Sequence, residues 1–257
     1  MELQNQSGAI ELLQKYAKEH CRAIIIDGSE GSGKSYLARQ YGQYLNIQAF
    51  LSVDPKIDTL KSAIDDCYAV DNDVVFCVEN LDLGVSAVAQ AILKFLEEPP
   101  ENVYIVITCR NIRQIPDTIL SRAIRVSLPP IVKFDLETYI EQVGSDHKDF
   151  IKIAFLDRCI KSFGDIDVLS KLNSEKLQYI YNIKDVVTET QSVSYIVWKF
   201  QKFPDSTDTP IVLVVRSLMQ NPRWVRPCIQ CLDTISKGRV GTHAALCMLA
   251  FELKALT

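Results

Sequence analysis

Gly28-Ser29-Glu30-Gly31-Ser32-Gly33-Lys34-Ser35 fits the GxxxxGKS pattern of a phosphate-binding loop, and this motif indicates the class of fold. The loop follows a short apolar run at 23–26 and precedes a segment with helical periodicity at 36–45. Glycines let the backbone curl so that successive N–H groups point at phosphate oxygens, and the helix N-terminus adds the positive end of its dipole. We therefore predict that these eight residues bind the phosphates of a nucleoside triphosphate.

Two side chains of the loop and one acidic residue further along the chain predict the cofactors ATP and Mg²⁺. Lys34 is expected to reach the β- and γ-phosphates, and the Ser35 hydroxyl is expected to bind Mg²⁺. A second magnesium ligand should follow a neighbouring strand, and Glu79 comes directly after the apolar run at 74–78. Ser35 and Glu79 are thus the candidate Mg²⁺ ligands.

The residue after Glu79 departs from the usual pattern. P-loop ATPases of this kind typically have Asp followed by Glu, whereas here Glu79 takes the first position and Asn80 the second. Asn80 can hydrogen-bond a water molecule but cannot take its proton. Asp82 either compensates for this or caps the next helix. The chain is a candidate ATPase, and the sequence leaves open whether ATP is hydrolysed.

Apolar runs alternate with helical patterns in the first half of the chain. Runs at 49–53, 74–78 and 103–108 follow the first one, which predicts an α/β fold with a parallel sheet covered by helices on both faces. A helix at 9–20, with Ser7 as its N-cap, is expected to precede the sheet. After Pro129-Pro130 helical patterns dominate, at 135–143, 148–162, 166–172 and 211–219, with a loop expected at 203–210.

Composition excludes some classes of protein. With 47% hydrophobic and 23% charged residues and no apolar run near the roughly 20 residues of a membrane span, a cytoplasmic protein without a membrane role is expected. The net charge of −4 argues against a surface that grips nucleic acid all over. Eight scattered cysteines suit reduced core thiols, and for the lone CxxC of Cys228 and Cys231 helix packing is favoured over a metal or redox site.

Two further motifs resemble those of a known family. Ala91-Ile92-Leu93-Lys94-Phe95-Leu96-Glu97-Glu98-Pro99-Pro100 is similar to the LLKxLEEPP segment of AAA+ clamp-loader subunits, namely the bacterial DNA polymerase III γ/τ and δ′ subunits and their phage relatives. Ile115-Pro116-Asp117-Thr118-Ile119-Leu120-Ser121-Arg122 resembles the family's IPxTILSRC signature, with Ala123 where cysteine is usual. Together with the P-loop, the resemblance covers roughly residues 23–130.

The resemblance implies a P-loop AAA+ domain at 1–128, a small helical lid at 129–185 and a helical collar or oligomerisation domain at 186–257. It further implies an ATP-binding clamp-loader subunit of DNA replication, working in a hetero-oligomer that loads a sliding clamp onto primed DNA. Arg122 matches the arginine that acts in trans as an arginine finger in that family. The candidate catalytic residues are therefore Glu79, Asn80 and, in trans, Arg122, and the expected partners are other clamp-loader subunits, the sliding clamp and the backbone of primed DNA.

Departures from the family pattern keep several functions open. The four-cysteine zinc module of the γ/τ type is missing, so a δ′-like or phage-like arrangement fits better. The sensor residue after the fourth strand falls near Cys109 or Arg110, and the lid's sensor arginine is replaced by an acid in the turn at 164–167. The alternatives to a hydrolysing subunit are a nucleotide-binding but non-hydrolysing structural subunit that donates Arg122, or another DNA-linked AAA+ switch such as a helicase loader. Three arginines of the last region form either a basic patch or a charged rim, Arg216, Arg223 and Arg226.

Overall fold

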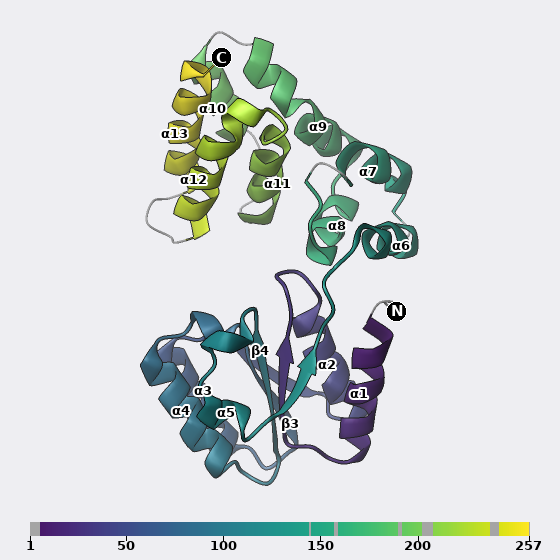
Figure 1. Cartoon of the computed structure of the whole chain (residues 1–257), viewed down its shortest axis with the longest axis vertical. Coiled ribbons are helices and arrows are strands. Elements are labelled where there is room, and N and C mark those ends of the chain that lie inside the picture. The colour runs from purple at the N-terminus through teal and green to yellow at the C-terminus, as the bar shows by residue number, and fades with distance from the viewer. Residues whose placement is uncertain are drawn as a thin grey trace. The chain divides into compact units, whose positions relative to one another are not determined.

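The computed structural model describes residues 6–143, 145–156, 159–189, 192–201, 208–236 and 242–256 of the 257-residue chain. The chain divides into two compact units, Met1–Asp135 and Leu136–Thr257. The first unit contains a β-sheet with helices, whereas the described part of the second unit is helical (Figure 1). The finer division expected at 185/186 stays a prediction.

The sheet of the first unit has five parallel strands in the order β2-β3-β4-β1-β5. Strands β1 and β4 run side by side with Asp27 paired to Cys109, so the residues that follow both strands meet at one edge of the sheet. The fifth strand was not expected from the sequence, because its four residues are mostly exposed and lack an apolar run. The strands are β1 Ala23–Asp27, β2 Ala49–Val53, β3 Val74–Val78, β4 Val103–Cys109 and β5 Ile124–Ser127.

Helices cover both faces of this sheet, so the predicted α/β fold is confirmed (Figure 1). Side chains of α1 and α2 form one apolar layer with one face, and those of α3, α4 and α5 form a second layer with the other. The interior strand β3 is buried along its whole length, which explains its unbroken apolar sequence. The helices are α1 Ser7–Lys18, α2 Lys34–Tyr44, α3 Ile57–Ala69, α4 Ser86–Glu97 and α5 Asp117–Leu120, with short 3₁₀ turns η2 Leu81–Leu83 and η3 Ile112–Gln114.

Several helix boundaries differ from those expected, and two of them are explained by side-chain contacts. Ser7 is the first residue of α1 rather than its N-cap; Gln6 precedes it, and the Gln6 side-chain amide donates to the Ser32 carbonyl over 2.5 Å, which ties α1 to the P-loop. The helix expected at 148–162 is shorter, because α7 ends at Phe155 and Ser162 caps the next helix in a capping box with Asp165.

The second unit is built from helices in its described residues. Helix α11 packs against α8 and α9, and α13 packs against α10 and α12. The loop expected at 203–210 lies mostly outside the described residues, and α11 begins at Asp208. In the residues that the structure describes, no helix combines the length and the apolar character that a membrane crossing requires. The elements from the boundary onward are α6 Lys133–Val143, α7 Lys148–Phe155, α8 Phe163–Ser170, α9 Ser174–Glu189, α10 Val193–Gln201, α11 Asp208–Leu218, η4 Pro222–Trp224, α12 Val225–Ser236 and α13 Thr242–Ala255.

Candidate nucleotide-binding site

The P-loop connects the end of β1 to the start of α2, as the sequence predicts. Gly31 and Gly33 have φ angles of 71° and 88°, a left-handed conformation that glycine adopts without strain, and Gly33 is the N-cap of α2. The backbone N–H of Gly28 donates to the carbonyl of Cys109 over 3.2 Å, which anchors the loop to β4. The N–H groups of the first turn of α2 therefore open onto the loop, where an anion would be stabilised.

Lys34 lies inside the loop with only 6% of its surface exposed. Its ammonium group donates to the carbonyls of Gly28 and Ser29 over 2.8 and 2.7 Å. Burial lowers the pKa of Lys34 below its ordinary value, and the positive charge of Arg110 lowers it further. Beside it, the Ser32 hydroxyl is buried without a hydrogen-bond partner. A buried ammonium and an unsatisfied hydroxyl within a curled backbone fit the oxygens of a polyphosphate.

The two predicted magnesium ligands lie together. The Ser35 hydroxyl donates to Glu79 Oε2 over 2.6 Å, although the residues come from different elements, the start of α2 and the end of β3. Ser52 at the edge of the sheet donates to the other oxygen of Glu79 over 3.1 Å. A hydroxyl and a carboxylate side by side are the hard oxygen donors that Mg²⁺ prefers, so the residues present fit this ion.

Thr108 is the functional residue that the sequence analysis missed. The sensor residue was expected near Cys109 or Arg110, but Thr108 is the fully buried polar residue at the end of β4. Its hydroxyl donates to Glu79 Oε2 over 3.2 Å and accepts from the backbone N–H of Asn80 over 2.8 Å. The signal available in the sequence was the small polar residue Thr108 within the mostly apolar run of β4. Thr108 thus fixes the orientation of positions 79 and 80.

Asn80 and Asp82 both form hydrogen bonds with the residues that follow β4. Asn80 has a left-handed φ of 48°, and its side-chain oxygen accepts from Nε of Arg110 over 3.3 Å. The Asp82 carboxylate accepts from the backbone N–H groups of Arg110 and Asn111 over 3.0 and 3.1 Å. The idea that Asp82 caps the next helix is wrong, since the N-cap of α4 is Val85, which makes no side-chain cap. The Asp82 carboxylate instead binds two backbone N–H groups at the start of the loop that follows β4.

Arg122 follows α5, and its guanidinium contacts groups of its own chain. One nitrogen lies 2.9 Å from Glu97 Oε1 of the LEEPP segment, and the other donates to the carbonyl of Thr118 over 2.7 Å. About a third of the side chain, 37%, is exposed. The ion pair therefore leaves part of the guanidinium accessible to solvent. The role of Arg122 in trans remains a prediction.

In the second unit an acid and an arginine form a buried ion pair. The side chain of Asp165 is only 6% exposed, accepts hydrogen bonds in the capping box of α8 and lies 3.1 Å from Arg216 of α11. Arg216 is therefore paired, and of the three arginines proposed as a patch only Arg223 and Arg226 are exposed. Asp165 thus joins two helices, and Asp167, the second acid of the turn at 164–167, accepts from the Tyr139 hydroxyl over 2.7 Å.

Cys228 and Cys231 are buried on α12, and the thiol of Cys231 lies 3.7 Å from the carbonyl of Ala245 on α13. The eight cysteines all lie in the described residues and are reduced. No group of three or more His, Cys, Asp or Glu side chains could hold a metal ion among the residues described. The contact with Ala245 places Cys231 in the packing of α12 against α13.

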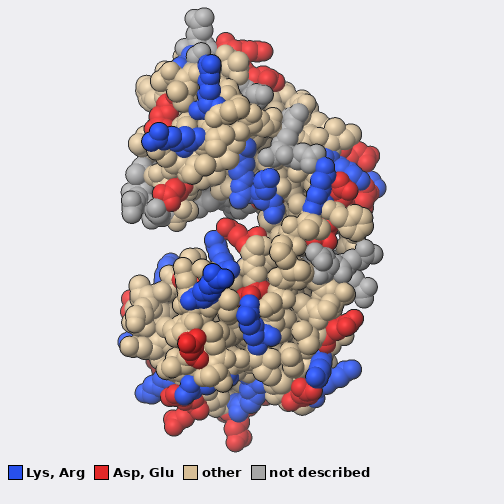
Figure 2. All heavy atoms as spheres, viewed as in Figure 1, with Lys and Arg blue, Asp and Glu red and all other residues tan. Residues whose placement is uncertain are grey.

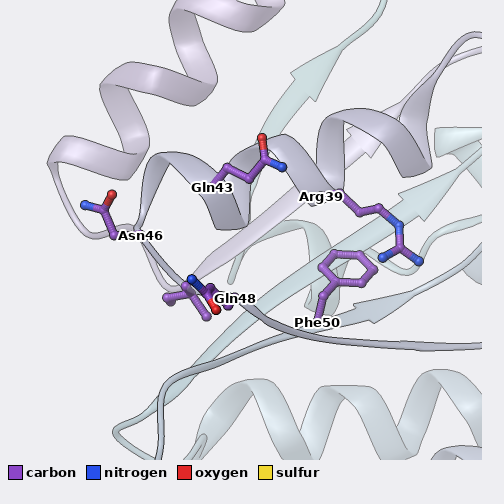
Figure 3. A pocket seen from close by; sticks show the side chains of 6 residues that line it. Arg39, Gln43, Asn46, Gln48 and Phe50 are labelled. Carbon is purple, nitrogen blue, oxygen red and sulfur yellow. The ribbon is translucent and has the colours of Figure 1, made fainter.

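An open hollow lies at the opposite end of α2 from the P-loop (Figure 3). The Arg39 guanidinium lies over the ring of Phe50 at 4.4 Å from its centre, and the remaining lining is mostly amide side chains. The polar side chains around it are not buried, so the hollow does not present a buried polar group that would hold a ligand. Its lining residues are Arg39, Gln43, Asn46, Ile47, Gln48 and Phe50.

A parallel sheet with a P-loop after β1 and an acid after β3, followed by a helical unit, defines the AAA+ class of nucleotide-binding proteins. Comparison with solved structures agrees. A DNA polymerase III γ-subunit-related protein from Thermotoga maritima matches with a TM-score of 0.58 at 17% identity, covering 97% of this chain and 100% of that one. The RuvB Holliday junction branch migration motor from the same organism matches with a TM-score of 0.54 at 13% identity, over 94% and 79%. The fold is that of an AAA+ protein.

Within this class the chain is similar to subunits of DNA polymerase III. Residues 53–132 match the family model described as "DNA polymerase III, delta subunit". DNA polymerase III subunit gamma of Buchnera aphidicola subsp. Acyrthosiphon pisum is 25% identical over 52% of this chain and 47% of its own length. The protein of that name from subsp. Baizongia pistaciae is 23% identical over 42% and 38%. The chain thus spans less than half the length of these relatives, and the resemblance inferred from its motifs is confirmed.

Proposed function

We propose that the chain is a Mg²⁺-ATP-binding subunit of a clamp-loader-like AAA+ assembly that acts in DNA replication. The observation that carries the proposal is the approach of Ser35 to Glu79 at 2.6 Å, next to the buried ammonium of Lys34. The sequence similarity to DNA polymerase III subunits supports the assignment to replication. In this role the subunit works with partner subunits to place a sliding clamp on primed DNA.

Different residues of the site bind the phosphates and the magnesium ion. Lys34 and the backbone N–H groups of the loop bind phosphate oxygens, and Ser35 and Glu79 hold Mg²⁺. Bound ATP supplies a phosphoanhydride bond and a terminal phosphate that a neighbouring subunit can recognise. Thr108 keeps Glu79 in place from the side of β4. Arg122 reaches the nucleotide of the adjacent subunit, where its charge stabilises the transferring phosphoryl group.

Nucleotide binding is tested by titrating the protein with a fluorescent ATP analogue in the presence of Mg²⁺. Lys34→Ala should abolish binding, because it removes the ammonium that lies within the loop. Lys61→Ala removes a solvent-exposed lysine of α3 and should leave the affinity unchanged. The proposal fails if the wild-type protein shows no Mg²⁺-dependent binding, or if both variants bind like the wild type.

A second candidate is a subunit that binds ATP without hydrolysing it, and Asn80 favours it. The amide cannot accept a proton from water, and its oxygen already accepts from Arg110. An ATPase assay on the reconstituted assembly separates the two candidates. Wild-type turnover that Lys34→Ala stops and Asn80→Glu speeds would favour the hydrolysing subunit, whereas turnover that appears only in Asn80→Glu would favour the structural one.

Contact with DNA is expected to be local. On the face shown in Figure 2, basic and acidic side chains are interspersed on both units and do not form one continuous basic surface. With a net charge of −4, affinity for DNA would come from a few phosphate contacts shared with partner subunits. Binding of the assembly to primed DNA should therefore weaken steeply with salt and be indifferent to base sequence. A salt titration with two unrelated primer-template sequences tests both properties.

A further inference from the structure

Arg110 is the first residue after β4, and the topology of the sheet places it beside the P-loop. Strand β4 pairs with β1 up to Cys109 and Asp27, so the residues that follow them run next to each other. The backbone N–H of Arg110 is held by Asp82 over 3.0 Å. Its guanidinium spans the site, 3.0 Å from Glu30 Oε2 in the P-loop and 3.3 Å from Asn80 Oδ1.

The charges around this guanidinium point to an anion as its other partner. Arg110 and Lys34 are close enough that the charge of Arg110 lowers the pKa of Lys34, so two cations face the same loop. Lys34 donates to two neutral carbonyls, and Glu30 is the acid that contacts Arg110 directly. The Glu30 side chain is 69% exposed, so it is free to move away, and an ion pair this exposed is weak. A polyphosphate carries more negative charge and fits a guanidinium better.

We infer that Arg110 is a phosphate-contacting residue in cis, which Glu30 holds at the edge of the loop until the terminal phosphate of a nucleoside triphosphate displaces the Glu30 carboxylate. This inference rests on the proposed function, because it needs a nucleotide in the P-loop. Arg110 makes this site discriminate triphosphate from diphosphate.

The test measures the dissociation constants of Mg²⁺-ATPγS and Mg²⁺-ADP for the full-length protein and three variants. Arg110→Ala should weaken ATPγS binding by about tenfold or more, with a smaller effect on ADP, since a charge-assisted bond to phosphate is lost. Glu30→Gln should strengthen ATPγS binding, because it removes the competing carboxylate. Arg113→Ala removes an exposed arginine three residues along the chain and should change neither affinity.

The opposite effects expected for Arg110→Ala and Glu30→Gln on ATPγS binding distinguish this inference from a purely structural contact. If the pair only stabilised the loop, Arg110→Ala and Glu30→Gln would weaken binding in the same direction and by the same factor for both nucleotides. That result, or an unchanged ratio of ATPγS to ADP affinity in Arg110→Ala, overturns the inference. The proposed function would survive it, since loss of binding in Lys34→Ala tests that function separately.

Discussion

At the scale of single residues, the site depends on how Glu79 is held. Its two carboxylate oxygens accept from Thr108 and Ser35 on one side and from Ser52 on the other. Thr108 is fully buried, and its hydroxyl also accepts a hydrogen bond from the backbone N–H of Asn80. Ser52 lies on the edge strand and is exposed. Burial therefore makes Thr108 the more important of the two supports.

Thr108→Val should destabilise the protein by about 1–3 kcal/mol, because the isosteric change leaves the partly buried N–H of Asn80 without its acceptor. It should also weaken the Mg²⁺ dependence of nucleotide binding, as Glu79 loses its anchor. Ser52→Ala removes a hydroxyl from the other oxygen and should change the free energy of unfolding by less than about 0.5 kcal/mol, since water replaces it. Urea unfolding of both variants checks this, and equal costs would contradict the ranking.

At the scale of elements, the turn from β1 to α2 leaves no room for a side chain. A Cβ added to Gly28 would lie 2.8 Å from Ser32 Oγ and 2.9 Å from Leu128 Cβ. The serine side chain can rotate, but Leu128 Cβ is fixed to the backbone that follows β5. Gly8, on the exposed side of α1, has nothing within 4 Å of the same added atom.

The two glycines should therefore respond oppositely to the same substitution. Gly28→Ala should lower the free energy of unfolding by about 1–3 kcal/mol through overpacking. Gly8→Ala should raise it by about 0.5–1 kcal/mol, because alanine loses less backbone entropy in a helix. Thermal unfolding of the two variants gives the signs, and a gain in stability for Gly28→Ala would contradict the packing of the turn.

The pair of α12 and α13 gives a prediction about pH. Burial raises the pKa of Cys228 to about 12 and of Cys231 to about 11, from an ordinary value of 9.0. Both thiols are therefore protonated in the folded protein at about pH 8 and react slowly with iodoacetamide, more slowly than the half-buried Cys247. The unfolded chain ionises first as pH rises above 9.0, so the stability from these thiols is present below that pH and is lost towards about 12. Labelling followed by mass spectrometry checks the order, and fast reaction of Cys228 would indicate a redox role.

At the scale of the whole molecule, the proposed assembly depends on Arg122. Within its own chain the guanidinium pairs with Glu97, so removing either partner breaks the same ion pair. In the proposed function, Arg122→Ala additionally removes the cation that this chain donates to the neighbouring site. Because arginine fingers contribute about 10³- to 10⁵-fold, this variant should lower the ATPase rate of the reconstituted assembly strongly, whereas Glu97→Gln should not. Equal rates in the two variants would mean that Arg122 acts only within its own chain.

Much of this protein follows from local sequence patterns. The P-loop, four of the five strands, the sheet covered on both faces and the pairing of Ser35 with Glu79 were predicted, because these features depend on residue type, periodicity and the known geometry of a strand-loop-helix turn. The fifth strand was missed, since an exposed edge strand of four residues has no apolar run. The end of α7 was also missed. Local periodicity continues through Ser162, and its role as an N-cap depends on the capping box that it forms with Asp165.

The class of fold and the residues of the phosphate loop follow from neighbours along the chain, so both can be predicted without a structure. Four contacts could be found only in the folded protein, namely those of Thr108 with Glu79, Asp82 with the loop after β4, Arg110 with Glu30 and Asp165 with Arg216. Each of these contacts joins different elements of the fold. Such side chains meet only after parallel strands have aligned their ends and helices have packed, which no local pattern encodes.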